Sequence, residues 1–223
     1  MDRDEHYGKR ACVFLKEVKS FVPDYDEMVG KIIALLQKEW PKRILDIGSG
    51  AGNIDMLILD LVPASEIDCV ETSKEMANVS VSTLGRHLDR AEIIHKDVMD
   101  FNPEGKYDAI ISNLVLHNMA VEEKARLLGR IRGWLAPHGI FIWSDMTRHE
   151  KKEAKKGPCM QRLGIAMRHG AGKRPAEAAI MKGAEHDYPL TEEETSKLAD
   201  EAGFAGFFLE WKRGGFAIFS MRR

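Results

Sequence analysis

The strongest constraint on the fold of this chain is a glycine-rich segment at residues 44–52, which reads ILDIGSGAG. Its first residues are an apolar strand signal, and the segment runs directly into a predicted helix that begins near Asn53. Glycines at positions 48, 50 and 52 allow a tight turn between the two, because a residue without a Cβ adopts positive φ at no steric cost. Since the N–H groups at the start of the helix face that turn, the segment predicts a site for part of a nucleotide or nucleoside.

The spacing of these glycines differs from that of a dinucleotide-binding turn. In the pattern G-x-G-x-x-G/A the third small residue lets helix and strand pack closely, whereas Asn53 stands at that position here. Asp46 also precedes the first glycine by two residues, and a carboxylate is poorly suited to a pyrophosphate site. Asp46 is instead predicted either to accept hydrogen bonds from the N–H groups of the turn or to face a cationic ligand. A glycine turn that binds no cofactor is the remaining alternative.

Apolar runs alternate with amphipathic segments along most of the chain. Five such strands joined by helices predict an α/β fold with a doubly wound parallel sheet. Two β-rich runs around Arg213-Gly214-Gly215 predict a terminal antiparallel hairpin, so the whole sheet is expected to have seven strands and to be mostly parallel. The predicted strands are 43–47, 67–71, 91–95, 107–112, 140–144, 207–211 and 216–221; the predicted helices are 24–39, 53–61, 72–88 (capped by Thr72), 121–136 and 191–202 (capped by Thr191).

A length of 223 residues fits a single domain, here 1–223, with an N-terminal helical cap at 1–40 and an insert at 148–189. Residues 148–174 hold nine Lys or Arg against two Glu, and three interpretations compete. The insert is a lid over the site, a surface that attracts an anionic acceptor or RNA phosphates, or a solvated segment. A helical lid is favoured, because the few aromatic residues in the insert argue against a stacking platform for single-stranded RNA.

Composition excludes several classes of protein. The formal charge of −2 gives no bulk affinity for nucleic acid, and no apolar run approaches the roughly 18 residues of a membrane span. The N-terminus lacks the apolar core of a signal peptide, and the three cysteines have no metal-ligand spacing, so no metal site is expected. A cytoplasmic location without membrane contact is the expectation.

Taken together, these pieces resemble the class I S-adenosylmethionine-dependent methyltransferases over residues 40–145 and 190–223. The resemblance implies a Rossmann-like methyltransferase fold and S-adenosyl-L-methionine as cofactor. Gly48 and Gly50 match the first motif of the family, and Glu71 matches the acidic residue that holds the ribose hydroxyls. The remaining matches come after the third and fourth strands: Asp97 and Val98 stand at the adenine positions, and Asn113 stands under the methionyl part.

A narrower similarity is to the carboxy-S-adenosylmethionine synthases and their close methyltransferase relatives. It rests on the segment FVPDY, on Asn113, on the insert and on Pro189-Leu190-Thr191. It implies that Tyr25 reaches over the amino-acid end of the cofactor. The synthases use an arginine in the insert to pair with an extra carboxylate, and that position here is Lys182. A lysine lacks the bidentate fork of arginine, so the departure favours ordinary methyl transfer.

Methyl transfer from a sulfonium needs neither a metal nor a covalent intermediate, and most of its acceleration can come from alignment and desolvation. His117 is the candidate general base, because an unperturbed imidazole titrates near about 6.5. The alternatives are that His117 only walls the pocket or caps the next helix. Asp145 ends the fifth strand and faces either the acceptor or solvent, and a strand-end carboxylate is more often solvated.

A small-molecule acceptor is the favoured partner. Three alternatives stay open: a tRNA or other RNA methyltransferase, a nicotinamide-dependent oxidoreductase, which Asn53 and the terminal hairpin oppose, and a cofactor-binding regulator that never turns over. The sequence predicts neither the identity of the acceptor nor the oligomeric state.

Overall fold

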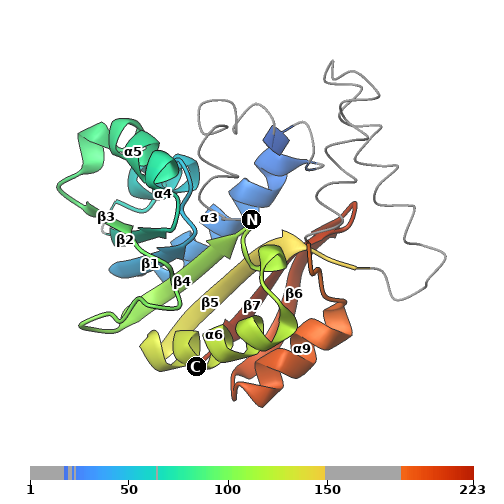
Figure 1. The fold of residues 1–223 in the computed structure, drawn as a ribbon. Coiled ribbons are helices and arrows are strands. Elements are labelled where there is room, and N and C mark those ends of the chain that lie inside the picture. Colours follow the sequence, from blue (N-terminus) through green and yellow to red (C-terminus); the bar gives the residue numbers. More distant parts are fainter. Residues whose placement is uncertain (1–17, 20–21, 23, 64, 149–186) are drawn as a thin grey trace.

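A computed structural model describes residues 18–19, 22, 24–63, 65–148 and 187–223 (Figure 1). The predicted cap before residue 24 therefore lies mostly outside the described residues. The insert predicted at 148–189, Lys182 included, lies outside them except at its two ends. None of the helices in the described ranges is both long and apolar enough to cross a membrane.

One seven-stranded sheet organises the fold, with strand order β3-β2-β1-β4-β5-β7-β6. The first five strands of that order are parallel, and β7 runs antiparallel between β5 and β6 (Figure 1). The predicted mostly parallel sheet with a terminal hairpin is thereby confirmed. The strands are β1 (Arg43–Ile47), β2 (Glu66–Glu71), β3 (Ala91–His95), β4 (Tyr107–Asn113), β5 (Leu135–Met146), β6 (Ala205–Arg213) and β7 (Phe216–Arg222).

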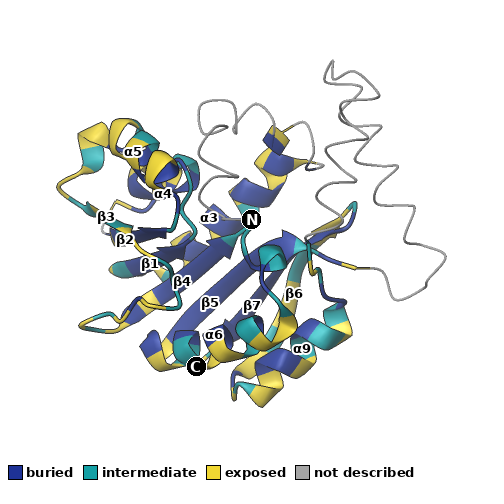
Figure 2. Ribbon diagram, in the orientation of Figure 1, coloured by how far each residue is buried: buried dark blue, intermediate teal, exposed yellow. Residues whose placement is uncertain are grey.

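Helices cover both faces of the sheet (Figure 1). On one face, α3 (Tyr25–Glu39) and α4 (Asn53–Leu61) pack on strand residues such as Ile44 and Cys69. On the other, α6 (Val121–Trp134) and α9 (Glu192–Glu201) pack on residues such as Leu45. The central strands are therefore buried on both sides, while the outer faces of the helices are exposed (Figure 2). One more helix, α5 (Lys74–Thr83), connects β2 to β3.

The sheet order changes direction between β1 and β4. The chain moves outward from β1 through β2 to β3, and then returns to the other side of β1 at β4. The connections that follow β1 and β4 diverge at this point, and open α/β sheets generally bind ligands outside the carboxyl ends of the strands at such a point. A ligand is expected at that edge of the sheet.

Several predicted boundaries are wrong. The helix predicted to end at residue 88 ends at Thr83, and the strand predicted at 140–144 spans Leu135–Met146. Ser73, not Thr72, caps α5: its Oγ accepts from the N–H of Met76 at 3.4 Å, and the preceding turn is held by the bond from the Ser73 N–H to Glu71. The helix predicted to end at residues 136–137 ends at Trp134, because β5 already pairs with β4 at Leu135.

The β4–β5 register then shifts over residues 136–139. The capping box at Thr191 and Glu194 is confirmed, and Gly203 after the helix has a φ of 80°, which is typical of a glycine that ends a helix.

Candidate active site

The turn after β1 needs its glycines for two different reasons. Gly48, Gly50 and Gly52 all have positive φ, at 74°, 58° and 78°. A Cβ added to Gly48 would lie 2.4 Å from Cγ2 of Val115, so the loop after β4 closes directly over this glycine. A Cβ added to Gly50 would meet nothing within 4 Å. The turn is thus packed at Gly48 and open beside Gly50.

Glu71 at the end of β2 joins this turn to the next strand. Its Oε2 accepts from the Gly50 N–H at 2.8 Å, and its Oε1 accepts from the Ser73 N–H at 2.7 Å. Glu71 as a whole is 8% exposed. Two hydrogen bonds to backbone fix its orientation, and a carboxylate has about four lone-pair sites in all. An oriented carboxylate of this kind can accept from hydroxyl groups of a ligand at the open side of the turn.

Buried acids gather on the face of the sheet that carries α3 and α4. Because side chains alternate along a strand, Asp46 points to the same face as Ile44, and Glu71 to the same face as Cys69. Asp55 in the first turn of α4 meets them there. Asp46 is 3% exposed and Asp55 is fully buried.

Three of the four oxygens of Asp46 and Asp55 lack a hydrogen-bond partner. Neither oxygen of Asp55 has a hydrogen-bond partner, and Oδ1 of Asp46 has none. Burial and the mutual repulsion of the two groups raise the pKa of Asp46 well above its usual value, and burial raises the pKa of Asp55 to about 6. Tyr25 lies beside them, and burial together with the neighbouring carboxyls raises its pKa to about 12.

The turn itself does not use Asp46. The N–H groups of Gly48 and Ser49 donate to the carbonyl of Val70, and that of Gly52 donates to the carbonyl of Ser49. Of the two roles predicted for Asp46, orienting these N–H groups is therefore wrong. The other role, facing a cationic ligand, fits a buried carboxyl whose oxygen has no donor. The hydrogen-bond acceptors at this edge are an oriented carboxylate, which suits hydroxyl groups, and buried carboxyl oxygens without a partner, which suit a cation. They fit an adenosine-bearing sulfonium that also carries an ammonium group.

The other predicted ligand positions lie at the same edge of the sheet. Asp97 follows β3, and its Oδ1 accepts from the N–H of Met99 at 2.8 Å, which shapes the turn that contains Val98. Asn113 ends β4, and its Oδ1 is buried without a partner. The residue after it, Leu114, has a φ of 58°, a strained conformation for a bulky side chain. The contacts of these residues with a ligand remain predictions.

His117 and Asp145 form a hydrogen-bonded pair beyond β4 and β5. Nδ1 of His117 lies 2.5 Å from Oδ1 of Asp145, and the His117 N–H donates to Oδ2 at 2.8 Å. The Trp143 indole also donates to Oδ2, at 3.1 Å, and the Met146 N–H donates to Oδ1 at 2.8 Å. Asp145 is 2% exposed, so the expectation that such a carboxylate is more often solvated is wrong.

The charge state of Asp145 follows from these contacts. Burial alone would raise its pKa, but His117, Trp143 and the N–H of Met146 outweigh it and hold the pKa below its usual range. An ionised Asp145 can only accept hydrogen bonds, so the bonded Nδ1 of His117 carries a proton. The neutral ring then has its basic lone pair at Nε2.

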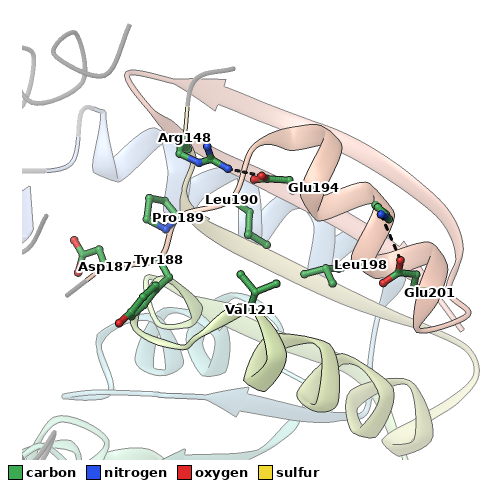
Figure 3. Close-up of a pocket in the computed structure, with 10 residues that line it drawn as sticks. Val121, Arg148, Asp187, Tyr188, Pro189, Leu190, Glu194, Leu198 and Glu201 are labelled. Carbon is green, nitrogen blue, oxygen red and sulfur yellow. Dashed lines mark hydrogen bonds and ion pairs between the residues drawn. The ribbon is translucent and has the colours of Figure 1, made fainter. Parts of the chain in front are cut away.

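A pocket of about 490 Å³ opens near this pair, between the start of α6 and α9 (Figure 3). Val121, Leu190 and Leu198 form the apolar part of the lining. Arg148 and Glu194, which form an ion pair, belong to its polar part (Figure 3). Tyr188 belongs both to this pocket and to the surroundings of His117, because its N–H donates to the His117 carbonyl at 2.6 Å. Among the described residues, no group of three or more His, Cys, Asp or Glu could hold a metal ion.

Two residues of the site were not identified in the sequence. Asp55 was included in an apolar helix, where a charge in the segment NIDMLILDL was the available signal. Lys124 lies in the helix predicted at 121–136 and is 1% exposed, which its charge does not suggest.

Comparison with known proteins finds similarity to methyltransferases. A family described as a methyltransferase domain matches residues 45–141. The carboxy-S-adenosyl-L-methionine synthase of Campylobacter concisus (strain 13826) is 26% identical over 217 residues, which cover 94% of this chain and 90% of that protein. A malonyl-[acyl-carrier protein] O-methyltransferase of Halalkalibacterium halodurans is 29% identical over 128 residues, or 53% of this chain. The chain spans about half the length of this second relative, 46%.

A solved structure shows the same fold. The magnesium protoporphyrin IX methyltransferase from Synechocystis PCC 6803 with bound SAH superposes with a TM-score of 0.70, at 14% identity, over 99% of this chain and 97% of that one.

Gly48 and Gly50 should differ in their tolerance of a methyl group. Alanine at either position costs about 1–2 kcal/mol for a left-handed backbone, and only Gly48→Ala adds the collision with Val115. Urea unfolding should therefore show a larger loss of stability for Gly48→Ala than for Gly50→Ala. Adding Val115→Ala should recover part of the loss at Gly48. Equal losses at the two positions would contradict the packing described here.

Asp55→Asn should stabilise the protein at pH 8. The folded-state pKa of Asp55 is raised from 3.8 to about 6, so its contribution to stability is present below pH 4 and is lost as the pH rises through 6. The difference corresponds to about 3 kcal/mol at pH 8. Urea unfolding at pH 4 and pH 8 measures it, with Asp60→Asn on the same helix as a control, because ion pairs with Arg86 and His87 lower the pKa of Asp60. A variant less stable than the wild type at pH 8 would refute the assignment.

Proposed function

We propose that this chain is a class I S-adenosylmethionine-dependent methyltransferase that transfers a methyl group from S-adenosyl-L-methionine to a small-molecule acceptor. One observation carries the proposal: the Glu71 carboxylate is bonded to the Gly50 N–H at the open side of the turn, beside the buried, unpartnered oxygen of Asp46. A carboxylate that can accept hydrogen bonds from hydroxyl groups and a carboxyl that can face a cation are thus adjacent at the carboxyl edge of the sheet.

The cofactor would be held by residues from four strand ends and one helix. Glu71 accepts from the ribose hydroxyls, and Asp97 with the backbone of Val98 contacts the adenine. Asp46 and Tyr25 take the charged amino-acid end, and Asn113 lies under the methionyl part. When bound, the cofactor supplies an electrophilic methyl group on a sulfonium.

The residues of the chain then contribute alignment, exclusion of water and a proton acceptor. His117 would accept at Nε2 the proton of an acceptor hydroxyl, which leaves the acceptor oxygen as the nucleophile for the methyl group. Asp145 holds the Nδ1–H at 2.5 Å, which fixes the ring tautomer and stabilises the imidazolium. The buried Trp143 indole and the Met146 N–H keep Asp145 ionised and oriented. His117 is therefore proposed as the catalytic base and Asp145 as its positioning residue.

A second candidate is a carboxy-S-adenosylmethionine synthase, favoured by the similarity to such a protein over 94% of the chain. Lys182 in place of the arginine of that group argues against it. Mass spectrometry of the ligand that copurifies with the protein separates the two. S-adenosylmethionine or its demethylated product supports methyl transfer, and a carboxylated sulfonium supports the synthase.

Glu71→Ala should weaken cofactor binding by about 1–3 kcal/mol, because the ribose hydroxyls lose a charged acceptor. Calorimetric titration with S-adenosylmethionine measures the change. Glu66→Ala, at the exposed opposite end of the same strand, is the matched control and should bind as the wild type does. Unchanged affinity in Glu71→Ala, or binding of NADH in place of S-adenosylmethionine, would contradict the assignment.

His117→Asn should lower kcat by about a hundredfold or more and remove the acid limb of the rate profile, since the variant cannot accept a proton. The cofactor affinity should not change. The assay uses methyl-labelled S-adenosylmethionine and an acceptor found by screening cell extract. His138→Asn is the control, because His138 is exposed, lies near the start of β5 and has a φ of 65° that asparagine tolerates. A rate profile of unchanged shape would leave His117 as a wall of the pocket.

A further inference from the structure

A fully buried lysine lies behind the His117 loop. Lys124 in the first turns of α6 is 1% exposed, and its Nζ donates to two backbone carbonyls, those of Met119 and Tyr188, each at 2.6 Å. Met119 directly follows the short helix η2 (Leu116–Asn118), which contains His117. Tyr188 lies 64 residues away in sequence, in the segment that leads into α9. One amine therefore joins two distant stretches of backbone.

A second bond joins the same two stretches. The Tyr188 N–H donates to the His117 carbonyl at 2.6 Å, so Tyr188 is held through both its donor and its acceptor. The His117 N–H in turn donates to Asp145 at 2.8 Å. The backbone of His117 is thus held from one side by Asp145 and from the other by Tyr188, whose own position depends on Lys124. The segment at Tyr188 also passes the start of α6 at Val121, where both line the same pocket (Figure 3).

Burying the charged amine of Lys124 costs free energy, because the amine loses its hydration. Burial lowers the pKa of Lys124 to about 8, although Asp145 and Glu123 act in the opposite direction. A methionine would fill the same space without a charge to desolvate, but it would leave both carbonyls without this donor. The lysine therefore contributes donors to a particular backbone arrangement, and that arrangement surrounds His117.

We propose that Lys124 is a positioning residue for His117: its amine ties the Tyr188 segment to the loop after β4 and so holds the imidazole in register with Asp145. The inference rests on the proposed role of His117 as the base. It requires no knowledge of the acceptor, because the arrangement exists in the protein without ligand.

The test is Lys124→Met, compared with the wild type by NMR without ligand. Hydrogen exchange at the Tyr188 amide should speed up by about tenfold or more, since a charge-assisted bond to its own carbonyl is lost. Amides in the middle of β1 and β4 should exchange as before. The ring signal of His117, identified as the one missing in His117→Asn, should shift or broaden. Lys38→Met, at an exposed lysine of α3, is the matched control and should change neither observable.

Three further results separate the outcomes. Uniformly faster exchange in all amides would mean that Lys124 stabilises the whole domain, and an unchanged His117 signal would mean that it does not position the ring; either overturns the proposal. If Lys124→Met does not fold, Lys124→Gln keeps two N–H donors on a shorter chain, and it should give a smaller change in the same direction. The same exchange rate at Tyr188 in Lys124→Gln and wild type would overturn the proposal.

Failure of the base assignment gives a different result. In that case His117→Asn retains the full rate profile, while the ring signal and the Tyr188 exchange still respond to Lys124→Met. With both assignments correct, Lys124→Met lowers kcat without weakening S-adenosylmethionine in a calorimetric titration, and it has no further effect on kcat in a His117→Asn background.

Discussion

The hydrogen bond from the Gly50 N–H to the Glu71 carboxylate connects the two halves of the proposed cofactor site. It fastens the turn after β1 to the end of β2, and the second carboxylate oxygen fastens the start of α5 through Ser73. Gly50 must have positive φ to present its N–H in this direction, and Gly48 must lack a side chain so that Val115 can close over the turn. The geometry of three successive elements thus depends on one carboxylate and two glycines.

The same edge of the sheet is electrostatically unfavourable in the protein alone. Asp46 and Asp55 are buried together, three of their four carboxyl oxygens have no hydrogen-bond partner, and burial raises the pKa of each. Leu114 adds a strained backbone at the point where Asn113 leaves β4. Such features cost stability, and proteins retain them where a ligand or a reaction uses them. A cationic ligand would supply a positive charge for the two aspartates to pair with.

Most of the fold could be predicted because it depends on local patterns. Apolar runs, separated by glycine-containing turns, predicted the positions of all seven strands. Because the carboxyl ends of parallel strands lie at one edge of a sheet, Glu71, Asp97 and Asn113 could then be placed at the same edge. The missed features depend on contacts between distant residues. The burial of Asp145 and its bond to His117 join β5 to the loop after β4, and Lys124 bonds to a segment 64 residues away. The cap at Ser73 was misassigned because Glu71 takes the N–H of that residue, a contact that a capping pattern does not contain.

A crystal structure with S-adenosylmethionine soaked in would test the central claim most directly. The account predicts density outside the carboxyl ends of β1 and β4, with both ribose hydroxyls within hydrogen-bond distance of Glu71 and the ammonium group facing Asp46. An empty turn after β1 in fully soaked crystals, or a ligand whose phosphates occupy that turn, would contradict it.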